Sequence, residues 1–203
     1  MAMKFKILLV ISSLALTLSM MSNTYSRYVA DVDSNIDLLF AKWQILVNKN
    51  DITNNTTTSI NITPVMEENV NVAENTVAPS SKGYFDIDID PSNAGVSFDY
   101  SISLNIEDEN MPDLMISKYA VLDKDYSEGD QITTATILNN TIDGTVVYTA
   151  TAHEPFTIRV FFEWYEGVDE KMNDAADTNI GYEAAINNKS LLVNAEISFN
   201  QKI

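Results

Sequence analysis

Alternation of apolar and polar side chains is the strongest pattern in this chain. Residues 84–90 put Phe85, Ile87 and Ile89 on one side of an extended backbone and three aspartates on the other. Residues 96–106 repeat the alternation after a turn-forming stretch that contains proline and glycine. Because successive side chains of a strand point to opposite faces, each segment predicts a strand with one buried face. Two such strands across a short turn predict a β-hairpin.

Weaker alternation recurs along the rest of the chain. Further strands are expected at 36–47, 59–63, 114–122, 145–151, 156–165 and 191–199, and residues 132–138 fit a strand or a short helix. In the first of these, Phe40, Trp43, Ile45 and Val47 form the expected inward set. Residues 139–144 are expected to form a turn, and residues 167–188 an irregular stretch with at most one helical turn. Eight to ten strands with almost no helix predict an all-β fold, a two-sheet antiparallel sandwich of the jelly-roll type.

The beginning of the chain follows a different pattern. Lys4 and Lys6 precede an apolar run at residues 7–21, and polar residues follow. A helix that spans a bilayer needs about 20 apolar residues, whereas a charged start and a shorter apolar run are typical of a signal peptide. Small side chains at the third and first positions before a cut after Ser26 fit cleavage there. We therefore expect a signal helix over residues 1–26, with an uncleaved anchor as the alternative.

Composition limits the partners. The chain carries 29 acidic and 12 basic side chains, a formal charge of −17, which repels nucleic-acid phosphates and anionic lipid. We expect no nucleic-acid partner, and no membrane contact after the leader is removed. The absence of cysteine excludes disulfides and thiol chemistry, and a 45% hydrophobic content fits a folded core. Residues 40–203 are long enough for one such domain, and residues 27–39 lie between it and the leader.

The sequence contains no recognisable catalytic set. Its one histidine, His153, is followed by glutamate and proline, and the second histidine of a zinc-peptidase helix is missing. A nucleophile motif is also absent, so we expect a protein that is not an enzyme. Glu163 and Glu166 flank Trp164 and Tyr165, an arrangement found in some glycan-binding sites, although a core aromatic strand with outward acids explains it better.

Calcium is the one cofactor that the sequence leaves open. Two oxygen-rich segments supply acidic side chains, but both lack the central glycine of a calcium-binding loop, so solvated acidic faces explain them better. A third acidic stretch lies at residues 169–177. The weak candidate ligands in the two segments are Asp86, Asp88 and Asp90, and Asp123, Asp125 and Asp130.

Several segments together resemble the TasA and camelysin family of exported proteins from Gram-positive bacteria. They are residues 24–28, residues 41–48, residues 83–106, the Phe162-Glu-Trp164 motif, residues 173–178 with Gly181, and the final alternating strand that ends near Gln201. The resemblance spans most of the chain.

The resemblance implies a function that the residues alone do not. It implies a leader removed by a dedicated signal peptidase and a jelly-roll-like domain outside the cell. That domain assembles into biofilm matrix fibres with copies of itself or related matrix proteins, an N-terminal strand of one subunit completing the sheet of the next. The matching segment would be residues 27–39, with Tyr28, Val29, Val32, Ile36 and Leu38 as its assembly residues. A metallopeptidase activity attributed to camelysin is not carried over, because no zinc-ligand motif is present. The alternative is a secreted adhesin or glycan-binding module, which an exposed Trp43 or Trp164 beside carboxylates would favour.

Overall fold

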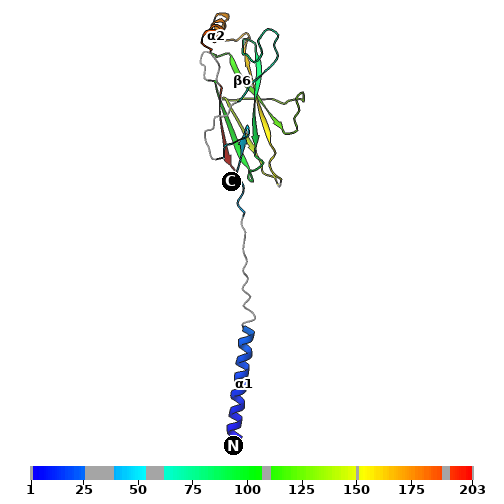
Figure 1. The fold of residues 1–203 in the computed structure, drawn as a ribbon, viewed down its shortest axis with the longest axis vertical. Helices are drawn as coiled ribbons and strands as arrows, with labels where there is room; N and C mark the ends of the chain where they lie inside the picture. Colours follow the sequence, from blue (N-terminus) through cyan, green and yellow to red (C-terminus); the bar gives the residue numbers. More distant parts are fainter. Residues whose placement is uncertain are drawn as a thin grey trace. The chain divides into compact units, whose positions relative to one another are not determined.

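The computed structural model describes residues 2–25, 39–53, 62–106, 111–149, 151–188 and 193–202 (Figure 1). The chain divides into an N-terminal unit, Met1–Phe40, and a second unit, Ala41–Ile203. The two units are described separately below.

The N-terminal unit contains one helix, α1, which covers Ala2–Tyr25. The side chains of residues 3–19 are exposed along its length. Within the described parts of the chain, no helix combines the length and apolar character that crossing a membrane requires. Its role as a signal peptide remains a prediction.

The second unit is built mostly from antiparallel strands, with one helix, in the residues that the structure describes. In chain order the elements are β1 (Leu46–Val47), β2 (Asn50–Asp51), β3 (Val65–Met66), β4 (Lys82–Asp90), β5 (Phe98–Ile106), β6 (Leu114–Asp123), β7 (Ala135–Thr136), β8 (Thr141–Val146), β9 (Phe156–Trp164), α2 (Asp174–Asn187) and β10 (Val193–Gln201). The predominance of antiparallel β structure confirms the predicted class.

The strands form two sheets of unequal width. The larger sheet has seven strands in the order β2-β1-β4-β9-β6-β7, with β3 also paired to β4. The smaller sheet has the order β10-β5-β8. Every pair is antiparallel, and β6 shifts register against β9 between Ile116 and Lys118, which marks a β-bulge.

The predicted hairpin between β4 and β5 is wrong. Both strands exist, but β4 pairs with β9 in the larger sheet, whereas β5 lies between β10 and β8 in the smaller one. Residues 91–97 carry the chain from one sheet to the other, with a turn in which the Ala94 amide donates to the Pro91 carbonyl. Alternation correctly identified the buried face of each strand but could not identify its neighbour.

Both sheets contribute to one hydrophobic core. Its fully buried side chains come from three strands of the larger sheet, β1, β4 and β9, and from two strands of the smaller sheet, β5 and β8. They include Val47, Ile87, Ile89, Phe98, Ile102, Ile142, Ile158 and Val160. Trp43 is half-buried and packs edge-on against Phe98, with ring centroids 5.9 Å apart.

Three further expectations need correction. Residues 39–45 form no strand, and Phe40, expected to point inward, is 95% exposed because it precedes the residues that join the core. The strand expected at 145–151 is β8, which begins at Thr141 inside the expected turn. Residues 174–187 form the 14-residue helix α2, which is much longer than the single turn expected.

The weak burial of helix α2 explains why the sequence did not predict it. None of its residues is fully buried, and its apolar contact with the domain is short, with Ala176 and Ile180 partly buried against it. Its start is instead fixed by Asn173, whose side-chain oxygen accepts hydrogen bonds from the amides of Ala175 and Ala176, both at 3.1 Å. Asp174, in the first turn, adds favourable charge at the helix N-terminus.

Candidate functional site

A buried aspartate organises the end of the domain that carries α2. The carboxylate of Asp113 accepts hydrogen bonds from the amide of Lys171, at 2.8 and 2.9 Å, and from that of Met172, at 2.5 Å. Its backbone carbonyl accepts the amide of Tyr165 at 2.8 Å. Asp113 therefore ties the loop after β9 to the loop before β6, and sequence reasoning missed it. A single acidic residue beside Pro112 gave no signal of burial.

Several carboxylates gather near the start of α2. Burial raises the pKa of Asp177, and the charges of Asp113 and Asp174 raise it further. The pKa of Glu166 is also raised, by desolvation and then by neighbouring acids, Asp177 foremost. Oδ1 of Asp177 and Nε1 of Trp164 are buried and find no hydrogen-bond partner within the described residues. This end of the domain is thus acidic, and the folded state favours the protonated forms of Asp177 and Glu166.

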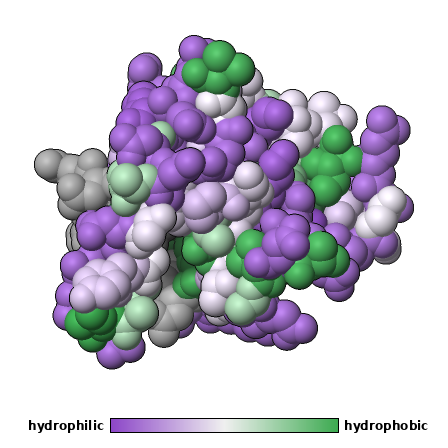
Figure 2. Space-filling model, turned by 90° about the horizontal axis from the view of Figure 1, so that it is seen from above, coloured by the Kyte–Doolittle hydropathy of each residue, from purple (hydrophilic) through white to green (hydrophobic). Residues whose placement is uncertain are grey.

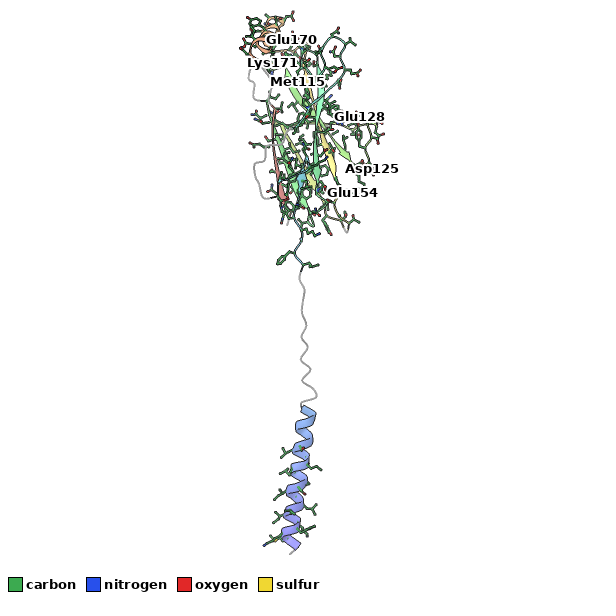
Figure 3. All side chains as sticks on the ribbon, in the orientation of Figure 1. Met115, Asp125, Glu128, Glu154, Glu170 and Lys171 are labelled. Carbon is green, nitrogen blue, oxygen red and sulfur yellow. The ribbon has the colours of Figure 1, made fainter. Side chains whose placement is uncertain are left out.

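The surface at this end is otherwise polar. Seen from above, it is mostly hydrophilic, with separate hydrophobic spots rather than one continuous patch (Figure 2). Glu170 and Lys171 lie beside α2, whereas Asp125, Glu128 and Glu154 lie along the side of the domain (Figure 3). The described surface of this end therefore shows no broad apolar contact area.

A buried arginine organises the outer face of the larger sheet. Arg159 donates from Nε and Nη2 to the two oxygens of Asp86, at 2.9 and 2.8 Å. Its guanidinium lies 3.8 Å from the ring centroid of Tyr84 and 5.4 Å from that of Tyr126. The hydrogen bonds to Asp86 raise the pKa of Arg159 despite its burial. This cluster pins the loop after β6, which carries Tyr126 and Glu128, to the sheet.

Each carboxylate in the first set of calcium candidates binds a different group of the same chain. Asp86 is paired with Arg159, Asp88 accepts the hydroxyl of Thr157 at 2.7 Å, and Asp90 accepts the amide of Ser92 at 3.0 Å. The three carboxylates lie along one strand and take three different partners. The arrangement fits a structural role for these side chains.

The second set serves to shape a loop. Asp123 accepts the amide of Asp125 at 3.0 Å, and Asp130 accepts the amide of Ser127 at 2.9 Å. In the described part of the chain, no group of three or more His, Asp or Glu side chains has an arrangement that could hold a metal ion.

His153 is a packed side chain in this structure. It is buried, Nε2 lies 2.9 Å from the carbonyl oxygen of Val96, and its ring stands edge-on to those of Phe98 and Tyr148 at 5.5 and 5.6 Å. The ring joins the segment before β9 to the beginning of β5. The geometry gives this histidine a structural role.

The tryptophans do not form an open aromatic platform. Trp164 is only 3% exposed and packs with Leu114, Met111 and Met172. Trp43 is half-buried against the core, as described above. Trp164 therefore cannot stack on a sugar ring in this conformation.

The candidate assembly residues Tyr28, Val29, Val32, Ile36 and Leu38 lie outside the described residues. The two residues that follow them, Leu39 and Phe40, are 96% and 95% exposed. Apolar residues therefore continue along the sequence to residue 40, and the last two of them are not buried.

The smaller sheet ends in two strands that each have one described neighbour. β10 and β8 both pair with β5. On β8 the inward side chain of Ile142 is almost completely buried, whereas all the inward apolar side chains of β10 are only partly buried. These four are Val193, Ala195, Ile197 and Phe199. The edge at β10 is thus the less completely covered of the two.

These features cannot be assigned by comparison with known proteins. No protein-family model matches the chain, and no curated protein sequence matches it either.

Proposed function

We propose that this protein is an exported structural subunit that assembles into an extracellular matrix or cell-surface fibre through its N-terminal segment, residues 27–39. In this account α1 is a leader removed after Ser26, and the second unit is a jelly-roll-like β-sandwich. Its partners are further copies of the chain or related matrix proteins, as in the TasA and camelysin family that the sequence resembles. The role needs neither a catalytic centre nor a cofactor.

One observation carries this proposal. Leu39 and Phe40, at the junction with the folded domain, are almost completely exposed although both are large and apolar. Exposed apolar chain next to a folded domain costs free energy in water, about 25 cal/mol for each Å². Burial in another subunit would recover that free energy. The segment of residues 27–38 that precedes them supplies five more apolar side chains of this kind.

Electron microscopy of two purified proteins tests the proposal. One begins at Arg27, and the other lacks residues 27–39. We expect filaments from the first and monomers from the second, because only the first carries the segment that joins subunits. Matching circular dichroism spectra would confirm that both contain the same folded domain. If the first protein stays monomeric across salt, calcium and pH, self-assembly is not its function.

A further inference from the structure

Helix α2 is held to its domain by little apolar contact. It lies at one end of the domain (Figure 1), and none of its residues is fully buried. Ala176 and Ile180 are the apolar residues of the helix that pack against the domain. A Cβ atom added at Gly181, in the middle of the helix, would meet nothing within 4 Å. Because helices in proteins are stabilised chiefly by packing of an apolar face, α2 can separate from the domain at a small cost in free energy.

The residues under α2 form a small apolar cluster, distinct from the core between the two sheets. Its buried members are Met111, Leu114, Trp164 and Met172, each at most 7% exposed. We call this group the Trp164 cluster. Because Ala176 and Ile180 supply part of its cover, separation of α2 would open the cluster to water. The helix therefore has the position of a lid.

The loop before α2 is fixed more firmly than the helix itself. The carboxylate of Asp113 accepts the amides of Lys171 and Met172, and Asn173 caps the first turn. Further along the helix, the side-chain hydrogen bond from Asn187 to Glu183 stays within α2. The helix can therefore swing away about its first turn while the loop that precedes it stays in place.

Asp177 is placed where its charge opposes closure of the helix. Its Oδ1 atom is buried and has no hydrogen-bond partner within the described residues. The charges that act on it come from Asp113, in the loop before β6, and from Asp174, on α2 itself. Glu166, in the loop after β9, is affected in turn by the charges of Asp177 and Glu170. Since all these neighbours are acidic, an ionised Asp177 is repelled in the closed position.

The proton affinity of Asp177 agrees with this geometry. Its pKa is raised when the helix is closed, by burial first and then by the charges of Asp113 and Asp174. Opening would return the carboxylate to water and restore an ordinary pKa, so the closed form binds the proton more tightly. Closure is therefore most favourable below the open-state pKa, and it weakens as the pH rises through the closed-state pKa.

We propose that α2 is a pH-sensitive lid over the Trp164 cluster. The lid stays closed when Asp177 is protonated, and it opens more often when Asp177 is ionised, turning about the loop that Asp113 holds. This inference is independent of the proposed assembly, because every residue that it uses lies within the second unit.

Acrylamide quenching of tryptophan fluorescence in the full chain tests the lid. The substitution Trp43→Phe removes the other tryptophan of the chain and keeps an aromatic ring beside Phe98. We expect the quenching constant of Trp164 to rise between about pH 4 and about pH 7, because opening admits the quencher. A constant that does not change with pH would overturn the lid.

Two further substitutions in this protein show which carboxylate controls the opening. Asp177→Asn should keep quenching of Trp164 low over the whole pH range, because the neutral side chain is not repelled in the closed position. Glu183→Gln is the matched control on the same helix, and it should leave the pH dependence unchanged. A pH dependence that persists in Asp177→Asn would overturn the role of Asp177.

Hydrogen exchange of the unsubstituted full chain gives a second measurement that does not depend on how well Trp43→Phe folds. Protection of the α2 amides, corrected for the intrinsic effect of pH on exchange, should fall between about pH 4 and about pH 7. The amides of β9, inside the larger sheet, should keep their protection and so exclude unfolding of the whole domain. Equal protection of α2 at both pH values would overturn the lid.

Discussion

Arg159 and Asp86 form an ion pair with two hydrogen bonds across strands β9 and β4, directly opposite each other in the sheet. The arginine side chain is 7% exposed, and that of the aspartate is 34% exposed. A buried guanidinium without its carboxylate is costly, because charge removed from water needs a partner. The pair therefore stabilises the outer face of the larger sheet chiefly by preventing an uncompensated charge.

Asp86→Ala should lower the free energy of unfolding by about 2–4 kcal/mol, somewhat below the full effect of a completely buried pair because Asp86 is partly exposed. Asp88→Ala is the matched control on the same strand face. It removes one hydrogen bond to Thr157 and should cost about 1 kcal/mol. Urea denaturation of both variants measures the difference, and equal losses would contradict the role given to Arg159.

Asp113→Ala should destabilise the domain by about 2–3 kcal/mol, because the amides of Lys171 and Met172 lose their acceptor in a buried loop. Hydrogen exchange should also show faster exchange in α2, whose first turn follows this loop. Asp169→Ala, which removes an exposed carboxylate from the same loop, serves as the control. Unchanged exchange in α2 would show that Asp113 does not anchor the helix.

Asp177 should make the domain less stable at neutral pH. Its pKa is raised in the folded state, so the proton is bound more tightly there than in the unfolded chain. The resulting stabilisation is present below the unfolded pKa and is lost as the pH rises through the folded pKa. Asp177→Asn should therefore raise the melting temperature slightly at pH 7, and the gain should vanish near about pH 3.

The melting temperature of an Asp99 variant should change in the opposite direction. Hydrogen bonds from Thr145 and then Lys202 lower its pKa, so its contribution to stability is present above the unfolded pKa and is lost as the pH falls. Asp99→Asn should lower the melting temperature at pH 7. If both variants shift the melting temperature in the same direction, the electrostatic account of the α2 end is wrong.

The sequence predicted the faces of the strands well and their partners poorly. Phe85, Ile87 and Ile89 are buried as their alternation indicates, because a strand's period of two is a local property. The pairing of β4 with β9 depends on contacts between residues about 70 positions apart. No local pattern encodes such a choice, and a seven-residue connection fits either a hairpin or a crossover between sheets.

The polar features were the least predictable. Arg159 interrupts an apolar strand, and that interruption opposite Asp86 could have suggested a buried pair, but only once the two strands were known to be neighbours. Helix α2 has a cap at Asn173 and only a short apolar contact, made by Ala176 and Ile180. Its sequence contains four alanines, but Gly181 in its middle and two aspartates, two asparagines and a threonine lower its helix propensity, which explains why only one turn was expected.

Electron microscopy of two adjacent substitutions in the protein that begins at Arg27 tests the central claim most directly. Ile36→Asp and Asn35→Asp each add one negative charge, but only the first places it on the face expected to enter a neighbouring subunit. The account predicts filaments from Asn35→Asp and monomers from Ile36→Asp, with matching circular dichroism spectra to show that both variants contain the same folded domain. Filaments from both variants would contradict assembly through this face of the N-terminal segment.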